Sequence, residues 1–117
     1  MPIQDVSDLR VYQLALQLLK KAYSLASLIE NDRVMTNNLR KTAAQIAPQI
    51  AEGYGKKASP REFKRYLEMA MGTSDEMVTH LQQVKLVCNV PQEGIDKFIE
   101  HYRSLSKQIN SLIKKWT

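Results

Sequence analysis

The chain has 117 residues, which is the size of one domain with a modest hydrophobic core. Apolar residues make up 44% and charged residues 25%, a globular composition that excludes intrinsic disorder. The formal net charge is +5 at pH 7, and this positive balance favours a polyanionic partner such as RNA or DNA.

No apolar run exceeds three residues, and the first residues lack a basic segment followed by an apolar one. We therefore expect neither a membrane span nor a signal peptide, and no membrane partner. The lone Cys88 cannot form an internal disulfide, so the cytoplasm is the expected location. Few glycines and prolines, and no alternating patterns typical of strands, indicate an all-α fold.

The first helix is expected over about residues 8–30, with Ser7 or Asp5 as its N-terminal cap. Its apolar side chains cover an arc of roughly 200° at about 100° per residue. A helix in a small bundle needs an apolar stripe of only about 100°. The surplus indicates either a second packing surface or a helix that is deeply seated in the core.

The second helix is expected over about residues 32–53, with Asn31 or Asp32 as its cap. Pro48 falls inside it, removes a backbone hydrogen bond and costs about 3 kcal/mol in a regular helix. Because the apolar pattern continues across Pro48, we expect a kinked but continuous helix. A clean break at Ala47 is the alternative.

A third helix is expected over about residues 60–89 and a fourth over about 92–116. Their apolar residues step by three and four, which is typical of helices in a left-handed bundle. Ala70, Gly72 and Ser74 place small side chains in the third helix. We expect another helix to approach closely at these positions.

Three short connections join the four predicted helices. Short connections force neighbouring helices to run antiparallel. The sequence therefore predicts an all-α, up-down-up-down antiparallel four-helix bundle that forms a single domain over residues 1–117.

The stretch between the second and third helices carries stop and start signals. Gly53 and Gly55 are predicted to end the second helix, because glycine enters the left-handed conformation without steric cost. Ser59 is expected to cap the third helix, with Pro60 at its first position. Glu62 can reach back to the cap and complete a capping box. These residues predict a tight helical hairpin.

Glu52 is an anion at a helix C-terminus, where the helix dipole disfavours negative charge. We expect a compensating partner for it, either Arg61, Lys64 or Arg65, or the backbone N–H groups that open the third helix. In either case Glu52 would lock the hairpin.

The predicted topology brings cations from distant parts of the chain to one end of the bundle. They are Arg10, Lys56, Lys57, Arg61, Lys64, Arg65, Lys114 and Lys115. The start of the third helix adds N–H groups and a positive dipole there, and Tyr54 and Tyr66 can stack on unpaired bases. We expect a nucleic-acid-binding site, for RNA more than for DNA. The alternative is a solvated end at which Lys114 and Lys115 complement the helix dipole.

The sequence lacks a readable catalytic motif. Glu76 and His80 are one helical turn apart, but a di-metal bundle needs several glutamates and two histidine motifs. Cys88 lies on the apolar seam of the third helix and is expected to be a small core residue rather than a nucleophile. We therefore expect no enzymatic activity, no cofactor and no metal.

Three elements occur in order along the chain: Ile50-Ala-Glu-Gly53, Ser59-Pro-Arg-Glu-Phe63 and Ala70-Met-Gly-Thr-Ser74. Together they resemble the bacterial four-helix-bundle proteins encoded by intervening sequences in 23S rRNA genes. That family includes the accessory variability determinants of diversity-generating retroelements. The family often has asparagine before the first element, where this chain has Gln49.

The resemblance implies a homo-oligomer, commonly a ring of five, with a basic surface. For the retroelement branch of the family it also implies binding to nucleic acid and to a reverse transcriptase. The apolar surplus of the first helix is consistent with such a ring. A basic surface repeated around a ring would bind with higher avidity than a single protomer.

Overall fold

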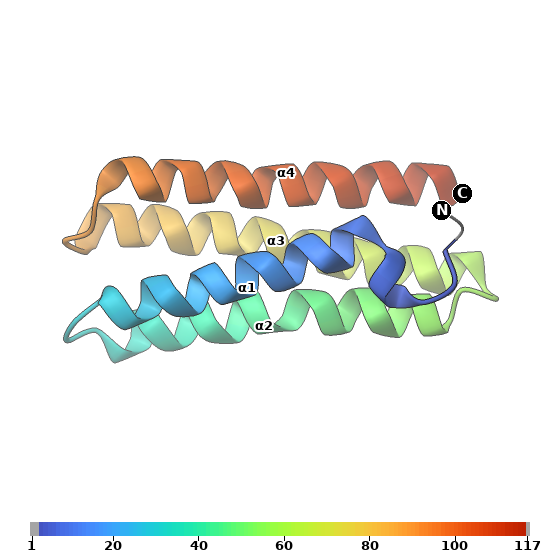
Figure 1. Ribbon diagram of the computed structural model, residues 1–117, viewed down its shortest axis with the longest axis horizontal. Coiled ribbons are helices and arrows are strands. Elements are labelled where there is room, and N and C mark those ends of the chain that lie inside the picture. Colours follow the sequence, from blue (N-terminus) through green and yellow to red (C-terminus); the bar gives the residue numbers. More distant parts are fainter. Residues whose placement is uncertain (1–2, 117) are drawn as a thin grey trace.

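Within residues 3–116, which the structure describes, four α-helices run back and forth along one axis (Figure 1). The structure is a computed structural model. In chain order its elements are the 3-10 helix η1 (Val6–Asp8), α1 (Arg10–Leu28), α2 (Arg33–Gly55), α3 (Pro60–Val87) and α4 (Gln92–Trp116). The bundle measures 46 × 22 × 22 Å along its principal axes. The prediction of an up-down-up-down antiparallel four-helix bundle is confirmed.

The two ends of the bundle are formed by different segments. The start of α1, the α2–α3 connection and the end of α4 meet at one end, which we call the cationic end (Figure 1). The α1–α2 and α3–α4 connections lie at the other end, which we call the far end. No helix of residues 3–116 combines the length and the apolar character that a membrane crossing requires.

The steps of three and four in α3 and α4 form the core as predicted. The buried residues of the α3 seam are Phe63, Leu67, Ala70, Ser74, Met77, Leu81 and Val84. On α4 they include Ile95, Phe98, Tyr102, Leu105 and Ile109. Cys88, the last member of the predicted seam, is only partly buried because α3 ends at Val87.

The start of α1 differs from the prediction. Neither Ser7 nor Asp5 caps it, because α1 begins at Arg10 and the preceding Leu9 has no side chain that can accept a hydrogen bond. Asp8 instead accepts from the backbone N–H groups of Gln4 and Asp5, which stabilises the short η1 turn. The two extra residues at each end of the predicted helix are therefore not α-helical.

Helix α2 begins and continues as its sequence indicates. The carboxylate of Asp32 accepts from the N–H of Met35 at 2.9 Å, so Asp32 is the cap. Asn31 has a φ of 61°, the left-handed conformation that asparagine tolerates in a tight connection. The helix is continuous through Pro48, so the alternative of a break at Ala47 is wrong.

The predicted glycine stop between α2 and α3 is correct in its position at Gly55 and wrong in its conformation. Neither Gly53 nor Gly55 has a positive φ, and α2 continues through both residues to end before Lys56. A Cβ atom at Gly53 would lie 2.7 Å from the Cβ of Tyr66 and 3.2 Å from the Cδ1 of Phe63. Gly53 is therefore required for the close approach of α2 and α3 rather than for ending a helix.

At the start of α3 the predicted cap is present, but the predicted capping box is not. Ser59 caps the helix by accepting from the N–H of Glu62 at 3.3 Å, and Pro60 occupies the first helical position. Glu62 does not reach back to the cap, because its carboxylate binds Arg65 and the N–H of Ser59 is already bonded to the carbonyl of Lys56. The capping box is thus incomplete.

Of the three small residues predicted at a close helix contact, two are confirmed. Ala70 and Ser74 are fully buried, and the Ser74 hydroxyl donates to the carbonyl of Tyr102 on α4 at 3.0 Å. Ser106 Oγ of α4 lies 2.8 Å from the Ser74 hydroxyl oxygen. The prediction for Gly72 is wrong, because Gly72 is exposed and a Cβ there would meet nothing within 4 Å.

The wide apolar arc of α1 allowed two interpretations: a second packing surface, or a helix that is deeply seated in the core. The structure excludes the deeply seated helix. Leu16 and Tyr23 remain 43% and 48% exposed. Arg40 of α2 lies over the Tyr23 ring, 5.6 Å from its centroid, and partly covers it. The surplus apolar surface of α1 is therefore on the outside of the protomer.

Candidate nucleic-acid interface

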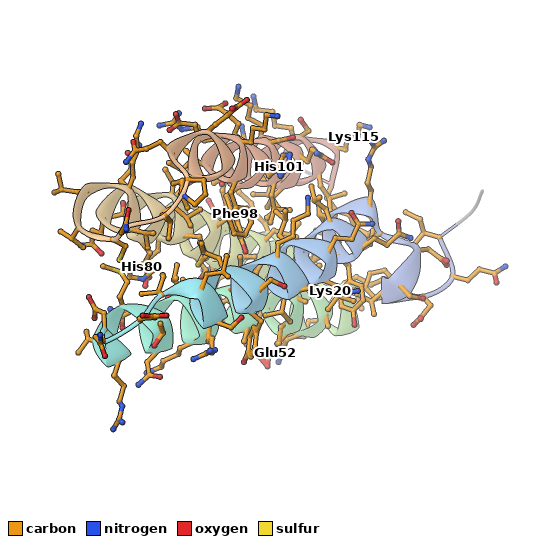
Figure 2. All side chains as sticks on the ribbon, turned by 60° about the vertical axis from the view of Figure 1, so that its left-hand side comes forward. Lys20, Glu52, His80, Phe98, His101 and Lys115 are labelled. Carbon is orange, nitrogen blue, oxygen red and sulfur yellow. The ribbon has the colours of Figure 1, made fainter. Side chains whose placement is uncertain are left out.

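The structure brings the segments that carry the predicted cations to the same end. Arg10 is the first residue of α1, and Lys56 to Arg65 span the α2–α3 connection and the start of α3. Lys114 and Lys115 lie in the last turn of α4, and Figure 2 shows Lys115 at that end of the helix. Residues more than 100 positions apart in the sequence thus contribute to one end of the bundle.

Six of these eight cations form no ion pair within residues 3–116. Arg65 forms an ion pair with Glu62, with Nε and Oε2 3.2 Å apart. No ion pair within residues 3–116 involves Arg10, Lys56, Lys57, Arg61, Lys64 or Lys115. Carboxylates are present at this end, however, because Asp5 and Asp8 lie in the segment before α1.

The ionisation of Glu62 reflects its positive surroundings. The hydrogen bond from Arg65 lowers the pKa of the Glu62 carboxyl, and the positive charges of Arg65, Lys56 and Arg61 lower this pKa further. The pKa of the Asp5 carboxyl, in the segment before α1, is lowered as well. A hydrogen bond from Ser7 is the main cause of its lowered pKa, and the charge of Lys57 contributes.

The two tyrosines at this end have different surroundings. Arg65 and Lys56 both lie over the Tyr66 ring, with the Arg65 guanidinium carbon 4.6 Å and the Lys56 Nζ 5.7 Å from its centroid. Tyr54 is buried, packs edge-on against Phe63 and has Lys57 Nζ 3.8 Å from its ring centroid. Tyr66 is therefore partly exposed and flanked by two cations, whereas Tyr54 is buried and the prediction that it can stack on a base is wrong.

The predicted lock by Glu52 does not form. Glu52 is exposed on the outer side of α2 (Figure 2), and within the described residues it makes no ion pair with Arg61, Lys64 or Arg65. Arg65 binds Glu62 in the same helix instead, three residues away, where the geometry is set by α3 alone. The backbone N–H of Glu62 is likewise already used by the Ser59 cap.

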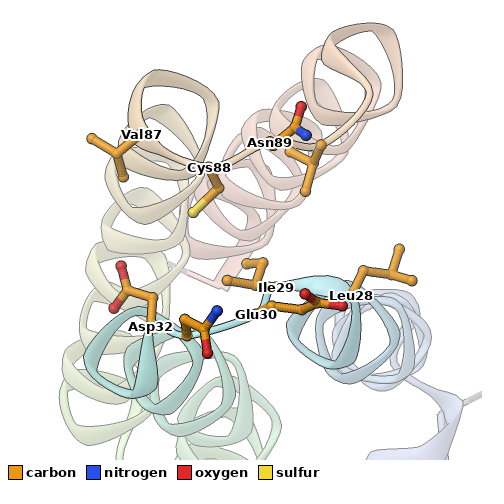
Figure 3. A pocket seen from close by; sticks show the side chains of 9 residues that line it. Leu28, Ile29, Glu30, Asp32, Val87, Cys88 and Asn89 are labelled. Carbon is orange, nitrogen blue, oxygen red and sulfur yellow. The ribbon is translucent and has the colours of Figure 1, made fainter.

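The far end has a different character. The α1–α2 and α3–α4 connections border a hollow of about 440 Å³, and Figure 3 shows Leu28, Asp32, Val87 and Cys88 around it. Several large apolar side chains here are exposed, namely Leu28, Val34, Leu86 and Val87. The charges are mixed: Lys85 binds Asp96 at 2.7 Å. The two ends of the bundle therefore offer chemically distinct surfaces.

Cys88 is expected to react slowly with alkylating agents. Burial, and then the nearby charge of Asp32, raise the pKa of its thiol, so the thiolate fraction at neutral pH is smaller than for a free cysteine. Iodoacetamide at pH 8 should therefore modify the folded protein several-fold more slowly than the protein in urea. Mass spectrometry measures both rates, and equal rates would contradict the effect of the fold on this thiol.

One polar cluster between α2 and α3 was not predicted from the sequence. Thr42 Oγ1 lies 3.2 Å from Glu76 Oε2 and 3.1 Å from His80 Nε2, and the same histidine nitrogen lies 3.1 Å from Glu76 Oε2. His80 lies between the two helices (Figure 2). Thr42 is 34 positions from Glu76, so only the predicted Glu76–His80 spacing was visible in the sequence.

This cluster cross-links the two helices and does not have the geometry of a catalytic triad. A triad needs the hydroxyl and the carboxylate on opposite ring nitrogens of the histidine, whereas here both lie at Nε2. Within residues 3–116, no group of three or more His, Cys, Asp and Glu residues is placed to hold a metal ion.

The fold and its cationic end define a class of protein: an antiparallel four-helix bundle in which cations from four chain segments meet at one end. The family model described as 23S rRNA-intervening sequence protein matches residues 7–111, which is most of the chain. The chain therefore belongs to the 23S rRNA-intervening sequence protein family. Among curated proteins and among solved structures, no significant match to this chain is found.

Proposed function

We propose that this protein is a non-enzymatic, homo-oligomeric bundle that binds nucleic acid in the cytoplasm, RNA in preference to DNA. The site is the cationic end, formed by Arg10, Lys56, Lys57, Arg61, Lys64, Arg65, Lys114 and Lys115. One observation carries this proposal: cations from distant segments meet there, and six of the eight lack an ion pair within the described residues.

The chemistry of the side chains suits phosphate and base contacts. Lysines make point contacts to phosphates, and arginines make bidentate ones. Tyr66, flanked by Lys56 and Arg65, is suited to stack on an unpaired base while the two cations bind the adjacent phosphates. Unpaired bases are frequent in the loops of structured RNA, which is the reason for proposing RNA.

Exposed apolar side chains support assembly into a homo-oligomer. Leu16 and Tyr23 on α1 and the exposed apolar residues of the far end offer surface that a second copy of the chain can cover. The family resemblance suggests a pentamer. In a ring, repeated cationic ends would bind one polyanion at several points, which raises avidity.

The salt dependence of binding tests the proposed function. A fluorescent structured RNA of about 30 nucleotides is titrated with the protein at several salt concentrations between 50 and 200 mM. If several phosphates are contacted, affinity should fall by about 10²-fold or more over this range. A duplex DNA of equal length is the matched comparison, and absence of RNA binding at 50 mM salt would refute the proposal.

A second candidate function is that of a protein-interaction or assembly adaptor, for example an accessory subunit of a retroelement reverse transcriptase. The exposed apolar side chains of the far end favour it, because they offer a protein-binding surface remote from the cations. Recovery of partners from a nuclease-treated lysate distinguishes the two functions. Partners that persist after nuclease treatment support the adaptor, and partners that disappear support nucleic-acid binding.

A further inference from the structure

An open groove follows the seam between α1 and α4, which is the least tightly packed contact between neighbouring helices. It consists of three hollows of about 380, 270 and 400 Å³. The first two share Arg10 and Gln108 in their walls, and the second and third share His101. The hollows therefore adjoin one another along the seam, and we call them together the α1–α4 groove.

The chemistry of the α1–α4 groove changes along its length. Toward the far end its wall is apolar and includes Leu28, Ile95 and Phe98. Figure 2 shows Phe98 between α4 and α1. The middle is polar, with Gln17, His101 and Ser104 among its lining residues.

Toward the cationic end the groove is bordered by Arg10 and Lys115. Lys21 adds positive charge along the rim near the far end, whereas Lys97 on the same rim forms an ion pair with Glu93, with Nζ and Oε1 3.9 Å apart. Asp8 is the acidic residue of the lining, and its carboxylate is already occupied by two backbone N–H groups. Apolar side chains line this part of the groove too, namely Ile3, Leu9, Val11 and Leu112. The groove therefore favours a ligand that is apolar toward the far end and carries carboxylates opposite Arg10 and Lys115 toward the cationic end.

The outer face of α3 has this complementary pattern. Exposed residues spaced by four and three form one strip along it: Glu68, Gly72, Asp75, Thr79, Gln82 and Leu86. We call this set the α3 strip. The sequence from Tyr66 to Val84 contains no lysine or arginine. The strip is thus acidic in its middle, apolar at Leu86 and open at Gly72, where no side chain projects.

The features of the groove and of the strip lie at matching heights along the bundle. Contacts between α3 and α4 set this register: Phe63 packs on Trp116, Ser106 donates to Asp75, and Lys85 binds Asp96. Leu86 is therefore at the height of the apolar part of the groove. Asp75 and Glu68 are at the height of its polar and positively charged parts.

We propose that a second copy of this chain places its α3 strip in the α1–α4 groove of its neighbour, side by side and in the same direction. Leu86 then contacts Leu28 and Phe98, while Asp75 and Glu68 face the positive part of the groove. The occupant is chosen by charge and register: Asp75 and Glu68 lie at the height of Arg10 and Lys115, and Leu86 lies at the height of Leu28 and Phe98. This inference rests on the homo-oligomer proposed above and names its contact surfaces.

The proposed contact also determines the type of assembly. Groove and strip are different surfaces of one protomer, with α1 in front and α3 behind it in Figure 1. The contact is therefore head-to-tail, not two-fold symmetric. Because both surfaces lie at the same height, successive protomers gain no rise along the bundle axis. A head-to-tail contact without rise closes into a ring, instead of extending into a helical filament, when the rotation between neighbours divides a full turn.

Three single substitutions at exposed positions of the far end test the contact. Leu28→Lys alters the groove, Leu86→Lys alters the strip, and Val34→Lys is the control outside both surfaces. These side chains are 67%, 83% and 72% exposed, so each variant should fold. Light scattering coupled to gel filtration, without nucleic acid, should show an oligomer for the wild type and the control and monomers for the other two variants.

Mixing the two monomeric variants gives the decisive result. The Leu28→Lys chain keeps an intact strip and the Leu86→Lys chain keeps an intact groove, so one sound contact can form between them. We expect a two-chain complex and nothing larger. Failure to recombine, or wild-type assembly of either variant alone, would overturn this contact while leaving the homo-oligomer standing. A monomeric wild type would overturn the homo-oligomer itself, and RNA binding is measured separately.

Discussion

Replacing Gly53 with alanine is expected to destabilise the bundle, whereas the same change at Gly72 is expected to stabilise it. A Cβ at Gly53 would lie 2.7 Å from the Tyr66 Cβ, so α2 and α3 must move apart. Overpacking of this kind costs about 1–3 kcal/mol, which exceeds the gain of about 1 kcal/mol in helix propensity. At Gly72 nothing lies within 4 Å, so only the propensity gain remains. Gly53→Leu should cost more still, about 3 kcal/mol.

Urea unfolding followed by circular dichroism measures these differences. The two alanine variants are matched controls for each other, since both glycines are helical and only their neighbours differ. Gly55→Ala adds a third comparison, because a Cβ there also meets nothing within 4 Å. Equal shifts for Gly53→Ala and Gly72→Ala would show that α2 and α3 are not in close contact at Tyr66.

Removal of three cations from the cationic end is expected to weaken RNA binding by on the order of 100-fold at 0.1 M salt. The variant carries Lys56→Ala, Arg61→Ala and Lys64→Ala, none of which breaks an ion pair within the described residues. The slope of log affinity against log salt should become shallower by about 1 for each phosphate that the variant no longer binds. Fluorescence anisotropy with the same structured RNA measures both quantities.

The control must remove the same charge elsewhere. Lys20, Lys41 and Lys107 are exposed and lie along the sides of the bundle, so changing all three to alanine gives an equal reduction in net charge. We expect this variant to retain affinity within a few-fold, because long-range attraction is screened beyond about 10 Å at 0.1 M salt. An equal weakening for both triple variants would mean that net charge, not the cationic end, determines binding.

Much of the fold could be predicted because its signals are repeated along each helix. The steps of three and four in α3 and α4 recur over many turns, so one misplaced residue does not change the outcome. The fourth helix has the predicted bounds, and Asp32 and Ser59 cap as expected. These are local properties, and a cap needs only its own next three residues.

The residues whose roles were predicted wrongly can each have more than one structural role in helical proteins. A glycine near a helix end can enter the left-handed conformation or admit a neighbouring helix. Gly53 has the second role because of Tyr66, which is 13 positions away in the sequence. Glu62 can bind the cap or a cation in its own helix, and Arg65 is the available partner. For Gly53 the deciding side chain lies in the next helix, outside the local pattern. For Glu62 both possible partners are local, and the sequence pattern does not rank them.

The candidate site was predictable in its position and not in its details. Topology alone places Arg10 and Lys115 at the same end, since antiparallel helices return the chain to it. Burial of Tyr54 depends instead on Phe63, which packs edge-on against it from α3. The apolar surplus of α1 was visible in the sequence, but only the structure places it outside.

The end of α4 provides the protein with its own optical reporter. Trp116 is the single tryptophan of the chain, and its ring packs edge-on against Phe63 with centroids 4.7 Å apart. Lys114 and Lys115 directly precede it, and Phe63 lies between Arg61 and Lys64 along α3. Any molecule that docks on these lysines and arginines changes the surroundings of the indole. Intrinsic emission can therefore follow events at this end in the unlabelled wild-type chain.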